Sequence, residues 1–144
     1  MKEKILETFK ALGFKLEDLE KLGYGFEYER KHFILTISDD EDFLYIAIPA
    51  VMELDENNAV SSYQLMEALN RKIKCVKAYV ILERIWLFYE RELFEEDDLQ
   101  QIVVHMIVHL DAAYDYIWSA VDDLEDSASG DSEATEITEK EDSE

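Results

Sequence analysis

The chain has 144 residues, which is enough for one hydrophobic core and too few for two ordinary domains. Hydrophobic residues make up 48% and aromatic residues 12%, so the body of the chain is expected to fold. Because 35 acids stand against 14 lysines and arginines, the net charge of −21 opposes binding to nucleic acid and to anionic membrane surfaces.

The apolar segments and the single cysteine further limit the class of protein. Stretches such as 102–110 are interrupted well before the ~20 apolar residues that span a bilayer. The N-terminus lacks the apolar core and cleavage site of a signal peptide, so a cytoplasmic protein is expected. Cys75 has no partner for an internal disulfide, and a buried thiol is the favoured interpretation.

The first half of the chain predicts one helix followed by an antiparallel meander. The helix carries four apolar residues at helical spacing: Ile5, Leu6, Phe9 and Leu12. Gly13 stands where a helix commonly ends. Between residues 24 and 48 the period changes to two, which predicts three strands. Pro49 cannot donate a ladder hydrogen bond and is expected to end the third strand.

The second half predicts a helix, a hairpin and a long final helix. The apolar residues of the second helix are Val60, Tyr63, Leu65, Met66, Leu69 and Ile73. Strand-like runs at 76–82 and 85–92 meet near Glu83 and Arg84, a hairpin without the usual glycine. The expected sheet therefore has five strands. The last helix, 96–124, contains no glycine or proline.

The last helix carries one continuous apolar seam for packing on the sheet. Its members are Leu99, Val103, Met106, Leu110, Ala113, Ile117, Ala120 and Leu124. Val104 and Val108 lie on nearly the opposite side of the helix. Aliphatic residues outside the main seam commonly contact another protomer, so a homodimer is predicted. The predicted partner or dimer surface comprises Val104, Val108, His105 and Trp118.

After Leu124 the composition changes abruptly. Residues 125–144 contain nine acids, one lysine and one large aliphatic residue, a net charge of −8. The tail has too little apolar surface for its burial to offset the loss of conformational entropy on folding. A disordered acidic tail is therefore predicted. The alternative is a tail that binds a partner. The predicted organisation is a single α+β domain at 1–124 and a disordered tail at 125–144.

Three segments of the chain resemble a known family. They are the strand run FLYIAIP with its terminal Pro49, the passage ALNRKIKCVKAYVIL with Asn70, Lys74 and Lys77, and the helix that follows ELF. With the order helix, three strands, helix, two strands, helix, the chain resembles the YbjN-like family of candidate bacterial sensory transduction regulators, within the type III secretion chaperone-like fold. The resemblance implies a small, often dimeric protein that engages other proteins, with no catalytic residues to transfer.

Two clusters contain side chains of the types that bind metal ions. His105 and His109 are four residues apart on the last helix, the spacing that lets two imidazoles bind one metal, and Asp98 lies on roughly the same side. No HExxH motif is present, and a polar flank or an interface is favoured over a metal site. The acidic run 39–42 lacks the pattern of a calcium loop and is interpreted as a hairpin turn. No cofactor is expected.

Aromatic residues gather on the last strand and near the end of the last helix, and basic residues at the end of the second helix and the start of the fourth strand. Six aromatic residues are expected to lie mostly in the core, with the remainder free to line a binding surface: Trp86, Phe88, Tyr89, Tyr114, Tyr116 and Trp118. The bases Arg71, Lys72, Lys74 and Lys77 are interpreted as cations that complement a helix dipole, over an anion or peptide-carboxylate contact.

The favoured hypothesis is a cytoplasmic, non-enzymatic protein-interaction or chaperone-like module that presents an apolar groove to a partner segment. The chain contains no serine elbow, phosphate loop or dinucleotide motif. The alternatives are a small-ligand sensor with a pocket between sheet and helices, a metal enzyme using His105 and His109, and a nucleic-acid mimic.

Overall fold

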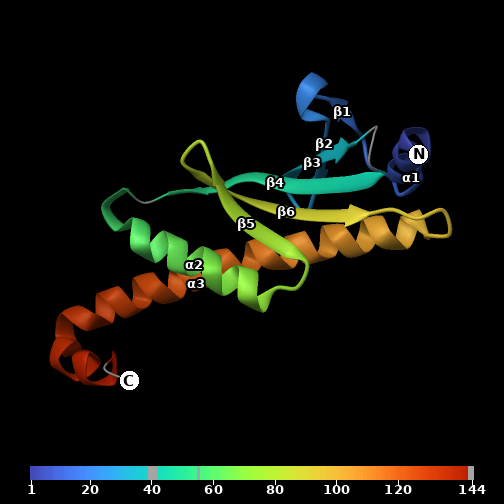
Figure 1. The fold of residues 1–144 in the computed structure, drawn as a ribbon. Coiled ribbons are helices and arrows are strands. Elements are labelled where there is room, and N and C mark those ends of the chain that lie inside the picture. The colour runs from blue at the N-terminus through green and yellow to red at the C-terminus, as the bar shows by residue number, and fades with distance from the viewer. Residues whose placement is uncertain (39–41, 55, 143–144) are drawn as a thin grey trace.

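Within the residues it describes, the computed structural model contains an antiparallel sheet and three α-helices (Figure 1). It describes residues 1–38, 42–54 and 56–142, with the backbone alone for residues 56, 59 and 123–142. The elements are α1 (Lys2–Ala11), β1 (Glu17–Asp18), β2 (Tyr24–Tyr28), β3 (Lys31–Ile37), β4 (Phe43–Glu53), α2 (Ala59–Lys72), β5 (Val76–Ile81), β6 (Arg84–Glu92) and α3 (Leu99–Asp142). The predicted order of helices and strands is confirmed.

The six strands form one sheet in the order β1-β2-β3-β4-β6-β5, with every neighbouring pair antiparallel. One face of this sheet, the inner face, supplies fully buried residues such as Leu35, Leu44 and Leu87. Buried residues of α1, α2 and α3 belong to the same core cluster. In Figure 1, α3 runs along one side of β4 and β6. The helices therefore cover the inner face, and the other face is the outer face.

The sixth strand, β1, is an addition to the five predicted from the sequence. It has two residues, and Glu17 and Asp18 pair with Gly25 and Tyr24 of β2. A strand this short is below the length at which alternation can be recognised. Gly23 precedes β2 with φ of +112°, and a Cβ there would lie 2.2 Å from the carbonyl oxygen of Leu35. Glycine is therefore required at this turn.

Strand β4 passes through Pro49, so the prediction that Pro49 ends the strand is wrong. The pairing of β4 with β6 changes register between Ile48 and Met52, and Pro49 lies in this bulge. On the other side, the paired residues of β3 reach Ala47 and stop before Pro49. The missing N–H of proline is tolerated because no ladder bond is required of it there.

The β5–β6 hairpin has a two-residue turn at Leu82 and Glu83, with Ile81 paired to Arg84. The φ angles of Leu82 and Glu83 are +51° and +65°. Positive φ at both central residues is the type I′ geometry that Asn-Gly usually supplies. Residues with a Cβ are strained in this conformation. The turn at Leu82 and Glu83 therefore lowers the free energy of unfolding.

Helix α2 buries Leu65, Met66 and Leu69 as predicted, but Val60 and Tyr63 are 69% and 53% exposed. These two residues lie in the first turns of α2. Helical spacing identifies the apolar side of a helix, but it does not show how far along the helix the rest of the core extends.

Asn70 connects the end of α2 to the edge strand β5. Its side-chain Nδ2 donates to the carbonyl oxygen of Ala78 at 3.2 Å, and the Ala78 N–H donates to Asn70 Oδ1 at 2.6 Å. The amide thus pairs with β5 in the way a neighbouring strand would. It covers part of a sheet edge that could otherwise pair with another chain.

The predicted seam of α3 is confirmed from Leu99 to Ala120, and its last member, Leu124, lies outside the residues whose side chains are described. Its central residues are fully buried: Val103, Met106, Leu110, Ala113 and Ile117. The backbone of α3 is helical to Asp142, whereas the sequence predicts an end at Leu124. The stretch 125–142 contains no proline, which is compatible with a helical path. The domain boundary at 124 stays a prediction. No helix in the described part of the chain is long and apolar enough to cross a membrane.

The Asn70 contact leads to a prediction about stability. Replacing Asn70 with alanine removes both bonds to Ala78, and the free energy of unfolding should fall by about 1–2 kcal/mol. Urea unfolding followed by circular dichroism would measure this change. Gln64→Ala, on an exposed position of the same helix, is the control and should change stability by less than about 0.5 kcal/mol. Equal stability of the two variants would contradict the role of Asn70.

Candidate protein-interaction surface

The outer face of the sheet is rich in aromatic and apolar side chains. Strand residues alternate between faces, so the neighbours of buried Leu44, Leu87 and Ala78 point away from the helices. No helix in the described residues packs there, since the buried helix residues join the inner core. The outer-face residues of β4, β5 and β6 are Phe43, Tyr45, Ala47, Glu53, Lys77, Tyr79, Ile81, Arg84, Trp86, Phe88, Glu90 and Glu92.

Three aromatic rings on this face form a stacked group, here called the aromatic platform. The rings of Tyr79 and Phe88 are parallel within 6°, with centroids 4.3 Å apart. Trp86 stacks beside Phe88 at 5.9 Å and 14°. Tyr79 remains 40% exposed, and the other two are half-buried. A platform of this kind is fixed by cross-strand packing and still offers apolar surface to a partner.

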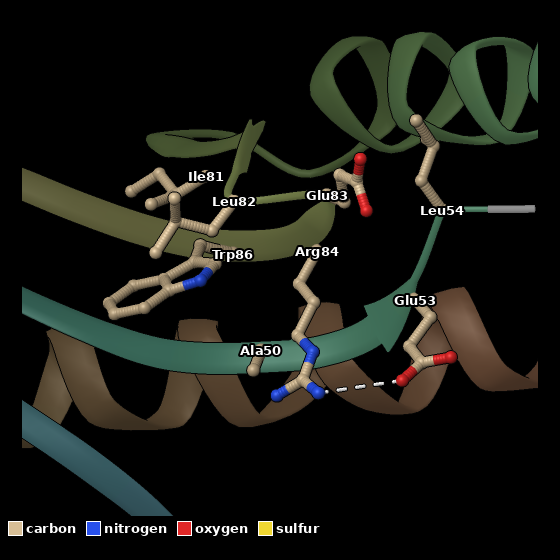
Figure 2. A pocket seen from close by; sticks show the side chains of 8 residues that line it. All are labelled: Ala50, Glu53, Leu54, Ile81, Leu82, Glu83, Arg84 and Trp86. Carbon is tan, nitrogen blue, oxygen red and sulfur yellow. Dashed lines mark hydrogen bonds and ion pairs between the residues drawn. The ribbon is translucent and has the colours of Figure 1, made fainter.

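A cavity of about 750 Å³ lies at the end of the platform, between the β4 bulge and the β5–β6 turn. Figure 2 shows Trp86 on the outer side of the strands, with Ile81 and Leu82 next to its indole ring. Leu82 is 90% exposed. Ala50 in the bulge has φ of +47°, so both walls of the cavity contain strained backbone.

Two polar contacts hold this end of the sheet together. Arg84 contacts Glu53 across the strands, with Nη2 of the arginine 3.5 Å from Oε1 of the glutamate (Figure 2). The Leu54 N–H donates to the carbonyl oxygen of Glu83 at 2.9 Å. Because the Arg84 and Glu53 side chains are 55% and 80% exposed, water and salt weaken their attraction. The backbone bond fixes the turn; the ion pair can exchange partners.

Charged groups surround the aromatic platform. Lys77 Nζ lies 3.9 Å from Oε1 of Glu90. Burial and, after it, the negative charge of Glu90 raise the pKa of the Tyr79 hydroxyl above its ordinary value. The negative charge of the Glu90 carboxylate is therefore felt electrostatically at Tyr79, a residue of the platform.

The structure places the predicted dimer surface on the exposed side of α3. Val104 and Val108 are 45% and 46% exposed, and with His105 they line a shallow cavity of about 520 Å³. Leu12, Gln100, Gln101 and His109 complete the lining. Trp118, 37% exposed, is not part of this group. It lies ten residues beyond Val108, or ~15 Å along the helix.

Charged groups separate the two parts of that predicted surface. Asp111 and Asp115 lie on α3 between Val108 and Trp118, and both contact the ammonium group of Lys31. Trp118 instead lies next to Tyr114, with ring centroids 6.4 Å apart. The valines and Trp118 are therefore two surfaces rather than one.

The two histidines of α3 are close neighbours. Their ring centroids are 3.9 Å apart, and Nδ1 of His109 lies 2.9 Å from the carbonyl oxygen of His105. Asp98 does not join them, because its Oδ1 accepts the N–H of Gln101 at 3.3 Å at the start of α3. No group of three His, Cys, Asp or Glu side chains within the described residues could hold a metal ion. Of the acidic run 39–42, residues 39–41 lie outside the described residues.

Cys75 is exposed, so the expectation of a buried thiol is wrong. Its φ of +69° places it in a turn between α2 and β5, where the chain reverses at the surface. The thiol contacts the hydroxyl of Tyr89, whose ring also lies edge-on to His105 and His109. Burial, then the hydrogen bond with Cys75, raises the pKa of Tyr89 to about 12.

The expectation that most aromatic residues lie in the core holds for part of the set. Tyr89 is buried, and Tyr114 and Tyr116 pack against the core. Trp86 and Phe88 point to the opposite face of the same strand. The sequence did contain a signal for this arrangement: β6 is apolar at consecutive positions 85–89, whereas a strand covered on one face should alternate. Tyr79 is the platform residue that the sequence interpretation omitted.

The predicted basic cluster is divided among separate contacts. Arg71 pairs with Glu67 one turn earlier on α2, and Lys77 pairs with Glu90 on the neighbouring strand. Lys72 lies over the ring of Tyr116, with its ammonium nitrogen 5.9 Å from the centroid. Three of the four bases therefore have separate contacts, and their role as cations that complement the helix dipole stays a prediction.

The geometry defines an α+β protein whose antiparallel sheet is covered by helices on one face. No protein-family model and no curated protein sequence matches the chain. Among solved structures, the chain is similar to YbjN from E. coli, described as a candidate transcription regulator. The TM-score is 0.63 at 9% identity, over 86% of this chain and 93% of YbjN. The YbjN-like α+β fold is confirmed, and at this identity the likeness shows the fold alone.

The raised pKa of Tyr89 leads to a prediction about pH. The pKa of Tyr89 is about 12 in the folded protein, against an ordinary value of 10.0. The neutral hydroxyl of Tyr89 therefore stabilises the folded state fully below about pH 10, and this contribution is lost as the pH rises through 12. The free energy of unfolding should therefore fall between pH 10 and 12, and Tyr89→Phe should remove part of this fall. Urea titrations across this range would measure it. Tyr63→Phe, at an exposed tyrosine, should keep the full dependence. The same curve for all three proteins would refute the assignment.

Proposed function

We propose that this protein is a non-enzymatic, regulatory or chaperone-like module that binds another protein through the outer face of its sheet. The observation that carries the proposal is the aromatic platform, which lies on a face that no helix of the described residues covers. Apolar side chains that stay partly exposed together on one face are typical of sites that bind other proteins. Trp and Tyr are also the residues that contribute most to protein interfaces. The net charge of −21 favours a protein partner over nucleic acid.

A small-ligand sensor is the second candidate, and the cavity beside Trp86 favours it. Its volume of about 750 Å³ suits a small molecule, and Arg84 would provide a charged group. Its walls, however, lie on the outer sheet face, whereas the sensor hypothesis placed the pocket between sheet and helices. A metal enzyme has less support, because His105 and His109 provide two ligands and a catalytic zinc site commonly uses three.

The proposal is tested by capture of partners from native lysate with variants of the platform. The full-length chain should capture a small set of proteins, and Tyr79→Ser/Trp86→Ser should lose them. Val60→Ser removes an exposed apolar side chain from α2 and should keep them. Mass spectrometry with circular dichroism of each variant would check both the partners and the fold. Loss of the same proteins in both variants, or capture of none by the native chain, would overturn the proposal.

We further propose that two copies associate through the exposed side of α3. The support is the pair Val104 and Val108, which lies outside the core seam beside the shallow cavity. Two apolar residues on each copy could pack across a twofold axis, so that the same patch meets itself. This surface differs from the outer sheet face, so a dimer would keep both aromatic platforms open to partners.

The dimer proposal predicts a change in mass upon substitution. Val104→Glu/Val108→Glu places carboxylates in the interface and should convert a dimer into a folded monomer, because burying unpaired charge is costly. Sedimentation equilibrium would measure the mass, and circular dichroism the fold. Val60→Glu adds charge at a distant exposed position and should leave the dimer intact. An unchanged mass of the valine double variant would exclude this interface.

A further inference from the structure

The outer face carries more acids than bases around the aromatic platform. Its two bases are Lys77 and Arg84, and each already has an acidic partner, Glu90 and Glu53 respectively. Within the described residues, no ion pair involves Glu83 in the β5–β6 turn or Glu92 at the end of β6. The β4–β6 part of this face therefore has three glutamates, Glu53, Glu90 and Glu92, against two bases, and Glu83 in the adjoining turn adds a fourth carboxylate.

Aromatic rings and carboxylates together favour one class of side chain. The faces of Trp, Tyr and Phe rings attract cations, and arginine most often makes this contact. A guanidinium group can stack on a ring and at the same time donate to a carboxylate. Glu90 and Glu92 follow Trp86 and Phe88 on the same face of β6, and Glu83 lies in the turn at the other end of the strand, so carboxylates flank the platform at both ends.

We infer that the outer face binds a basic, arginine-containing peptide segment of another protein, with guanidinium groups placed on the aromatic platform and paired with the surrounding glutamates. This inference rests on the proposed function and specifies its partner. The whole chain adds long-range attraction, because a net charge of −21 accelerates the approach of a cationic partner. An acidic partner would meet repulsion from the same charges.

A second copy of this chain fits the outer face less well than a basic peptide does. Each copy would bring its own Glu53, Glu83, Glu90 and Glu92 against the same residues of its partner. Like charges placed across an interface oppose association. The exposed valines of α3 carry no such charge, so self-association is assigned to α3 and partner binding to the outer face.

Titration of the full-length chain with two peptides tests the inference. One peptide contains several arginines in a glycine and serine background, and the other has citrulline at the same positions, which keeps the shape and removes the charge. In a Trp118→Phe background, Trp86 is the single tryptophan and its fluorescence reports binding at the platform. The arginine peptide should bind about tenfold more tightly than the citrulline peptide, consistent with a few charged contacts.

Matched variants separate the outer face from general charge attraction. Glu83→Gln/Glu92→Gln should weaken arginine-peptide binding about fivefold or more. Glu3→Gln/Glu7→Gln changes the net charge equally on the exposed surface of α1 and should weaken it less than about twofold. Equal weakening in both double variants, or no difference between the two peptides, would overturn the inference. Those results would leave the proposed function standing, because that is decided by whether Tyr79→Ser/Trp86→Ser loses captured partners.

Discussion

The burial of one seam of α3 against the inner face of the sheet is the contact on which the rest of the structure depends. Val103, Met106 and Leu110 are fully buried in the same core as Leu44 and Leu87. Successive side chains of a strand point to opposite faces of the sheet. The residues next to each buried core residue therefore lie on the outer face. The packing of α3 therefore fixes the inner core and, at the same time, the content of the outer face.

The outer face carries features that reduce stability, gathered at one end. Ala50 in the β4 bulge and Leu82 with Glu83 in the β5–β6 turn all have positive φ. Leu82 is also almost fully exposed. Strained backbone and exposed apolar groups are retained where the surrounding structure over-determines them, and they cluster at binding surfaces. The strained backbone and the exposed leucine thus lie beside Trp86, on the surface proposed to bind a partner.

Much of the fold follows from sequence periodicity, and the exceptions have physical reasons. The seam of α3 was predictable because 3.6-residue spacing selects one side of a helix, and the same spacing placed Val104 and Val108 on the exposed side. Periodicity could not decide the outer face, since Trp86 and Tyr89 are both aromatic and lie on opposite faces. Pro49 stays within β4 because of a bulge, which depends on pairing with β6 rather than on local sequence.

The chain is similar to YbjN in fold, but at 9% identity the two proteins share few of the side chains that form their surfaces. An arrangement of helices and strands can persist while almost all side chains change, so a fold does not by itself assign a function. In this chain an open aromatic face is combined with a net charge of −21, and a net charge far from zero opposes association between copies. The glutamates around the platform oppose contact between two copies of that face, and they favour a partner of opposite charge. The same carboxylates would disfavour self-association of this face and favour the basic segment proposed above.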